Sequence, residues 1–356
     1  DGIRDDLVTG VQTCALPIFL YGVVMLVVVA NIINIGADIA AVGAALNLLF
    51  PAPILLLSTI FTIIVLFLEI AIGYHAYAKF LKFLALSLLA YVFTAIIVHP
   101  NWNEVFRALV VPQITWEANY WYVIVALLGT TISPYMFFWQ ATEEVEEQKY
   151  AVKAGLPARS LRTIRRDNSI GMTISQLGSV FMIVTTAVVL HQHGLKEIGS
   201  AADAARALEP LVQGFPNAGT YAKILFALGI IGMGLLGIPV LAGSVSYAIS
   251  DTRTWRQGLD YKFSQAKQFY AVIILATAAG WLLNIIGVDP IHALVFAAVI
   301  NGLASIPLIF LIYRISNDSR VMGIHTGGPL SRTMLLAAFI ITLACGAILG
   351  YSLLSA

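Results

Sequence analysis

Charged residues are scarce in this sequence of 356 residues. Asp, Glu, Lys and Arg together make up 11% of the chain and hydrophobic residues 59%, whereas about a quarter of an average soluble domain is charged. So little charge excludes an ordinary soluble protein and indicates an integral membrane protein that contacts the lipid bilayer. The formal net charge of +1 argues against a nucleic-acid or strongly acidic partner.

Cysteines and enzyme motifs are also scarce. Cys14 and Cys345 lie near opposite ends of the chain, which excludes a disulfide framework or a cysteine metal cluster. The sequence contains no HExxH, GxSxG or P-loop pattern, so a hydrolase or a nucleotide-driven pump has no support. Gly232, Gly234 and Gly237 match the string GxGxxG, but they lie inside an apolar span, which favours close helix packing. We expect neither enzymatic activity nor a cofactor.

Long apolar runs, in contrast, are abundant. Nine of them are long enough to cross a bilayer as helices and too long to be strands of a barrel. They lie near residues 19–48, 53–74, 80–98, 119–140, 169–191, 221–249, 268–286, 290–313 and 333–354. We therefore predict an all-helical membrane protein in which residues 19–356 form one transmembrane domain. Lys and Arg concentrate in alternate loops, so the positive-inside rule predicts that the first span starts inside and the C-terminus lies outside.

Residues 1–18 differ from the rest of the chain. They begin without methionine and carry three Asp and one Arg, whereas a signal peptide needs a basic start followed by an apolar core. The stretch resembles translated sequencing adapter. We expect it to be non-native and the chain to be truncated at its N-terminus; the alternative is a genuine polar segment before the first helix.

A helix break is predicted in the middle of the fourth span. Pro134 has no N–H, so the carbonyl of Thr130, four residues earlier, loses its helical partner. Gly129 adds backbone freedom, and Ser133 is placed to cap a new half-helix that begins at Pro134. Secondary transporters bind ions and substrates at broken membrane helices of this kind. The alternative is a simple kink in which the hydroxyls of Thr130 and Thr131 bond the free carbonyl.

Polar residues inside membrane spans are costly and therefore informative. The first span carries Asn31, Asn34 and Asp38 on one face, and Asp38 is the only carboxylate deep in that span. We interpret Asn34 and Asp38 as part of an ion or proton route; the alternative is a buried Asp satisfied by Asn34 and nearby backbone. Small residues such as Gly36 and Gly43 indicate close packing of this helix on its neighbours.

Three further residues interrupt or perturb the other spans. Pro239 is expected to break the sixth span, and Pro307, after Asn301 and Gly302, to interrupt the eighth. Glu69 lies near the inner end of the second span, where snorkelling to the interface explains it without a function.

The order of these motifs resembles that of the Nramp (natural resistance-associated macrophage protein) metal-ion transporters. The run 127–135 resembles the sixth helix of that family, and the run 38–50 resembles the third. Shorter matches resemble the exit of the seventh helix, the eighth helix and the link after the tenth: His191-Gln-His193-Gly194, Leu241-Ala242-Gly243 and Val321-Met322-Gly323. The similarity covers essentially residues 19–356.

The resemblance implies a fold and a site. The fold is the LeuT-type inverted-repeat helical bundle, with nine of eleven transmembrane helices present and the first two missing. The implied metal ligands are Thr130 through its carbonyl, Ser133 at the family's methionine position, and Asn301 close to a polar ligand position of the tenth helix. The implied location is the bacterial inner membrane.

Departures from the family pattern bear on the transported ion. Ser133 offers a hard oxygen where the family has a thioether, which suits Mg²⁺ or Mn²⁺, with Fe²⁺ a further candidate. Tyr135 replaces a histidine linked to proton coupling, and a phenol with an ordinary pKa of about 10 is a poor proton shuttle at pH 7. Ala41 stands where the family carries a second carboxylate. The pattern resembles either the Nramp-related magnesium transporters or a manganese branch.

We therefore expect a secondary transporter that moves divalent metal cations by alternating access around residues 129–134. Protons are a candidate coupling ion, and no obligate protein partner is evident. The sequence leaves two alternatives open. One is a LeuT-type carrier of an organic solute such as an amino acid, and the other is a non-transporting membrane scaffold.

Overall fold

The computed structural model describes residues 10–71, 89–111, 114–153, 160–190, 201–212, 214, 217–259 and 261–355. These residues form helices and connecting turns, without a strand among them. The helices are α1 (Gly10–Leu49), α2 (Ile54–Ala71), α4 (Leu89–Val98), α5 (Trp102–Val110), α6 (Ala118–Ile132), α7 (Pro134–Lys153), α8 (Leu161–Val189), α9 (Ala201–Ala205), η3 (Arg206–Val212), α10 (Ala218–Arg253), α11 (Lys267–Ile286), α12 (Pro290–Asn317), α13 (Ser319–Met322), η4 (Gly323–His325) and α14 (Pro329–Ser355).

Eight helical stretches in the described part of the chain are long and apolar enough to cross a membrane, with α6 and α7 together forming one of them. They coincide with eight of the nine predicted spans and confirm an all-helical membrane protein. The predicted span 80–98 is described only over α4, because residues 72–88 lie outside the described part. α1 begins at Gly10 and so includes residues that we expect to be non-native; their origin stays a prediction, as does the sidedness of the chain.

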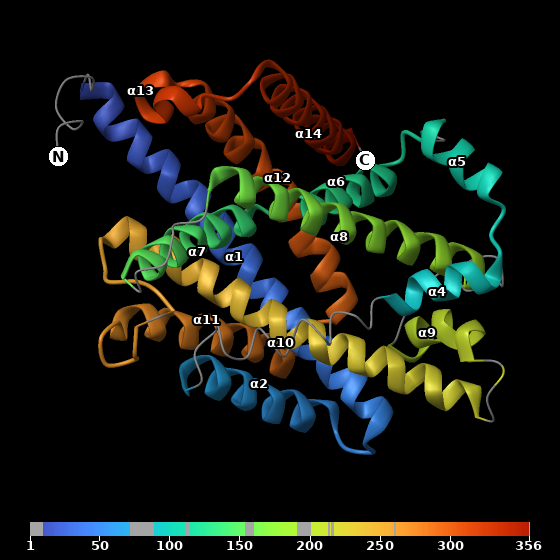
Figure 1. Ribbon diagram of the computed structural model, residues 1–356. Helices are drawn as coiled ribbons and strands as arrows, with labels where there is room; N and C mark the ends of the chain where they lie inside the picture. The colour runs from blue at the N-terminus through green and yellow to red at the C-terminus, as the bar shows by residue number, and fades with distance from the viewer. Residues whose placement is uncertain are drawn as a thin grey trace.

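Helix α1 runs through the middle of the bundle and packs against α2, α10, α11 and α12 (Figure 1). Glycines allow these contacts to be close. A Cβ atom on Gly36 would lie 2.7 Å from the carbonyl oxygen of Gly280 in α11, and one on Gly43 would lie 2.9 Å from Cβ of Ser58 in α2. The close packing predicted from the small residues of this helix is therefore confirmed.

The glycines of the GxGxxG string also pack against neighbouring helices. A Cβ atom on Gly234 would lie 2.4 Å from Cγ2 of Val42 in α1, and a Cβ atom on Gly237 would lie 3.6 Å from Oδ2 of Asp38. The string lies inside α10 and does not form a strand-to-helix loop. Helix packing, and not dinucleotide binding, explains it.

Two predicted interruptions are wrong. α10 continues through Pro239 and α12 continues through Pro307. A proline in a helix interior costs roughly 3 kcal/mol. Packing on both sides of these two helices compensates for that cost, since α10 contacts α1, α7 and α11, and α12 contacts α1, α6 and α14. A proline in the sequence therefore does not by itself distinguish a continuous helix from a broken one.

The expected snorkelling of Glu69 is also wrong. Its side chain is only 1% exposed, and neither carboxylate oxygen has a hydrogen-bond partner among the described residues. Glu69 shares the buried face of α2 with Ser58, Thr62 and Val65, and this face packs against α1, α10 and α11. The side chain therefore points into the bundle instead of towards the interface.

Candidate functional site

The predicted break of the fourth span is present. α6 ends at Ile132 and α7 begins at Pro134. Ser133 between them has φ 46° and ψ 75°, in the left-handed region that side-chain-bearing residues rarely adopt. The Ser133 amide still donates to the carbonyl of Gly129 at 3.0 Å, and its own carbonyl accepts from the amide of Met136 at 2.8 Å. The chain therefore stops one helix and starts the next within a single residue.

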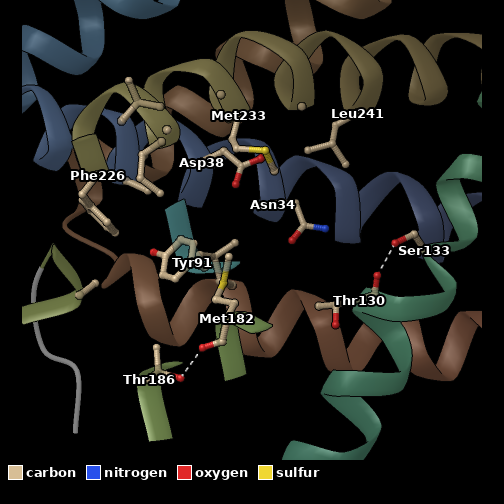
Figure 2. Close-up of a pocket in the computed structure, with 18 of the residues that line it drawn as sticks. Asn34, Asp38, Tyr91, Thr130, Ser133, Met182, Thr186, Phe226, Met233 and Leu241 are labelled. Atoms are coloured by element: carbon tan, nitrogen blue, oxygen red, sulfur yellow. Dashed lines mark hydrogen bonds between the residues drawn. The ribbon is translucent and has the colours of Figure 1, made fainter. Parts of the chain in front are cut away.

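The hydroxyls around the break bond differently from the prediction. Thr130 and Thr131 both donate to the carbonyl of Leu127, at 2.9 and 2.7 Å, and leave the gap at Pro134 unfilled. The Ser133 hydroxyl instead donates back to the carbonyl of Thr130 at 2.5 Å (Figure 2), and its side chain also interacts with the phenol of Tyr135 in α7. The oxygen freed by the proline is thus held by one movable hydroxyl in place of a backbone amide.

Gly129 serves close packing and not backbone freedom. It is helical, and a Cβ atom on it would lie 1.9 Å from the carbonyl oxygen of Ala298 and 2.4 Å from the amide nitrogen of Gly302, both in α12. Reciprocally, a Cβ atom on Gly302 would lie 2.5 Å from the carbonyl oxygen of Val125 in α6. Backbone therefore contacts backbone at this crossing, one turn before the break. The contact fixes α6 against the helix that carries Asn301.

A cavity of about 540 Å³ lies beside the break. It brings together six of the residues predicted from the sequence, which come from α1, α6, the break, α7 and α12: Asn34, Asp38, Thr130, Ser133, Tyr135 and Asn301. Figure 2 shows Asn34 and Asp38 facing the cavity from α1, and Thr130 and Ser133 at its other end. The two remaining predicted residues, Gly129 and Pro134, do not line the cavity but shape the break.

Polar groups around this cavity are poorly satisfied. The side chains of Asn34 and Asp38 form no hydrogen bond or ion pair with any described residue. Asn301 is 2% exposed, and its Oδ1 atom has no hydrogen-bond partner in the described part of the chain. Tyr135 interacts with both Ser133 and Asp38. Carboxylate and amide oxygens without partners in a low-dielectric interior cost free energy, and a bound cation relieves that cost.

The possible metal ligands are mostly oxygens. The described residues contain no group of three or more His, Cys, Asp or Glu side chains that could hold a metal ion. Coordination in the cavity would have to combine one carboxylate with backbone carbonyl, amide and hydroxyl oxygens, which are the ligands of hard divalent cations.

Sequence reasoning missed several cavity residues. Tyr91 of α4, Met182 and Thr186 of α8, and Met233 of α10 line the walls. Methionine and tyrosine in apolar spans are common as packing residues, so no pattern in the sequence separated these from the rest. The predicted histidines at the exit of the seventh helix, His191 and His193, lie outside the described residues.

Comparison with known families decides the relationship. A sequence model of the natural resistance-associated macrophage protein-like (Nramp) family matches residues 15–352. The chain belongs to the Nramp family. Nramp proteins are helical membrane transporters with the LeuT-type fold, so membership confirms the predicted fold class and argues against an enzyme.

One curated Nramp relative is the "Divalent metal cation transporter MntH" of Ralstonia nicotianae. It is 26% identical over 208 residues, which cover 56% of this chain and 44% of the relative. The match therefore spans less than half of the length of that protein.

Proposed function

We propose that this Nramp chain forms the pathway of a secondary transporter that moves divalent metal cations across the membrane by alternating access around residues 129–134. Membership of the Nramp family and the similarity to a divalent metal cation transporter of Ralstonia support the substrate class. The break, its contact with α12 and the cavity beside it support the position of the pathway.

The main support for this proposal is the single negative charge among the described residues that line the cavity. Among the described residues that line it, Asp38 is the only charged one, and no Lys, Arg or His is present. A single carboxylate in apolar walls attracts a cation strongly because the low dielectric weakens screening. The same walls repel an anion.

The oxygens at the break complete the proposed site. The proposed ligands are the carbonyl of Thr130, the hydroxyl of Ser133 and Oδ1 of Asn301. No described residue bonds the Asn301 Oδ1 atom. A cation that displaces the Ser133 hydroxyl from the Thr130 carbonyl gains both oxygens at once. Hard oxygen ligands of this kind suit Mg²⁺ or Mn²⁺. Proton coupling through Tyr135 is weak in this proposal because a phenol holds its proton at neutral pH.

The volume of the cavity is also compatible with the alternative function, a carrier of an organic solute. About 540 Å³ exceeds the space that a bare ion needs and falls in the range of small-molecule pockets. An amino acid, however, carries a carboxylate, which the Asp38 carboxylate repels, and the described walls provide no Lys, Arg or His to pair with it. A thermal shift caused by amino acids but not by Mn²⁺ would favour the organic-solute carrier.

Uptake measurements test the proposal. The protein, reconstituted in liposomes, is expected to take up Mn²⁺. Asp38→Asn removes the one charge among the described residues that line the cavity and should reduce uptake at low ion concentration at least about tenfold, equivalent to roughly 1.4 kcal/mol of binding free energy. Glu104→Gln in exposed α5 is the matched control and should leave uptake unchanged. Equal uptake by the Asp38 variant and the wild type would overturn the proposal.

A further inference from the structure

Helix α10 contributes one further possible ligand, Met233, to the cavity, away from the break. Gly234 and Gly237 bring α10 against α1, and a Cβ atom on Gly237 would lie 3.6 Å from Oδ2 of Asp38. Met233 lies one turn before Gly237, on the same face of α10. Its side chain is 45% exposed and lines the same cavity as Asp38. The thioether of Met233 and the carboxylate of Asp38 thus share one end of the cavity (Figure 2).

Helix α1 supplies two side chains with oxygen atoms to the same end of the cavity. Asn34 precedes Asp38 by one helical turn, about 6 Å along the axis, and both side chains face the cavity. Neither side chain forms a hydrogen bond or an ion pair with a described residue, and Asp38 interacts only electrostatically with the phenol of Tyr135, so both side chains are available to a ligand. Figure 2 shows Asn34 between Asp38 and the break.

We propose that Asn34, Asp38 and Met233 form a second cation-binding site, the staging site, which holds a divalent ion of intermediate softness before that ion reaches the break. This inference rests on the proposed function, since a staging site matters only if cations cross the cavity. A carboxylate, an amide oxygen and a thioether form a mixed hard and soft ligand set. Mg²⁺ gains little from the sulfur, whereas Cd²⁺ and, more weakly, Fe²⁺ and Mn²⁺ gain from it.

The staging site supplies a soft ligand that the break lacks. Ser133 at the break offers only oxygen, so selection between Mg²⁺ and softer ions cannot occur there through sulfur. Met233 places that selection on α10 instead. Met182 of α8 lines the same cavity, but it lies with Tyr91 and Thr186 on another wall (Figure 2), and it serves as the matched control.

Binding measurements in lipid nanodiscs test the staging site. Met233→Leu retains the volume of the side chain and removes the sulfur. We expect it to weaken Cd²⁺ binding about tenfold while Mg²⁺ binding stays unchanged, and we expect Met182→Leu to alter neither. Equal Cd²⁺ affinity of Met233→Leu and the wild type, or an equal loss in Met182→Leu, would overturn the assignment.

Cadmium X-ray absorption on the wild-type protein provides a test that needs no variant. We expect a sulfur neighbour in the Cd²⁺ coordination shell, which persists in Met182→Leu. A shell of oxygen alone in a wild-type protein that binds and transports divalent ions overturns the staging site and leaves the proposed function intact. A wild-type protein that binds no divalent ion overturns both.

Discussion

Replacing Gly129 by alanine tests the contact that holds the break in place. The new Cβ atom would lie 1.9 Å from the carbonyl oxygen of Ala298 and 2.4 Å from the amide of Gly302, whereas ordinary contacts begin at 3.4 Å. Both obstacles are backbone atoms, so no side chain can rotate away. α6 and α12 must therefore separate by roughly 1.5 Å, the difference between 3.4 and 1.9 Å.

The expected cost follows from two opposing effects. Overpacking of a tight contact typically costs about 1–3 kcal/mol, and alanine recovers up to about 1 kcal/mol of helix propensity relative to glycine. We expect Gly129→Ala to lower the free energy of unfolding by about 1–2 kcal/mol. Because Asn301 adjoins Gly302 and Thr130 adjoins Gly129, the same separation should pull the proposed ligands apart and reduce cation uptake.

A second glycine provides the control. Gly178 lies in α8, and no atom lies within 4 Å of the position that its Cβ would occupy. Gly178→Ala should therefore leave uptake unchanged and stabilise the helix slightly. Both variants are compared by thermal unfolding in detergent and by Mn²⁺ uptake in liposomes. If Gly129→Ala matched Gly178→Ala in both assays, the backbone contact between α6 and α12 would be refuted.

Three further changes probe the break and a helix end. Pro134→Ala restores an amide that can bond the Thr130 carbonyl, so we expect weaker divalent uptake in liposomes; unchanged uptake would remove that carbonyl from the ligand set. Ser133→Met should shift competition from Mg²⁺ towards Mn²⁺ and Cd²⁺, because a thioether then replaces the hydroxyl oxygen; unchanged competition counts against the ligand role. Asp289 caps α12 by accepting from the amide of His292 at 2.9 Å, and Asp289→Ala should cost about 1 kcal/mol in thermal unfolding. That bond holds the pKa of Asp289 below its ordinary value, so its contribution is present above about pH 4 and is lost as the pH falls through the lowered pKa; a difference from the wild type that does not change with pH would contradict this.

The break could be predicted from the sequence because its cause is local. A proline at mid-span removes one particular amide, and the affected carbonyl is four residues away whatever surrounds it. The same reasoning was wrong at Pro239 and Pro307, where packing by neighbouring helices sustains a continuous helix. What distinguishes Pro134 is the left-handed conformation of the residue before it, and that depends on tertiary structure.

The grouping of the site residues could be predicted only through the family resemblance. Asp38, Thr130 and Asn301 are far apart in the sequence, and no spacing rule connects three different helices. The role of Gly129 and the positions of Met182 and Met233 depend on how α6, α8 and α10 pack. This packing cannot be read from a pattern in a single sequence.

The orientation of Glu69 also could not be predicted from the sequence. Its position near the end of a span predicted an interfacial side chain, but the rotation of α2 turns it into the bundle. Depth along a helix can be counted from the sequence, whereas the direction in which a side chain faces depends on neighbouring helices.

The location of a bound ion tests the proposed pathway most directly. Crystals of the protein grown with Mn²⁺ and measured at the manganese absorption edge report where the ion lies through its anomalous scattering. We expect an anomalous peak in the cavity beside the break, within coordination distance of the Thr130 carbonyl and of Asn301. A protein that transports Mn²⁺ but places the ion away from the cavity, or a peak with no contact to these residues, would contradict the pathway proposed here.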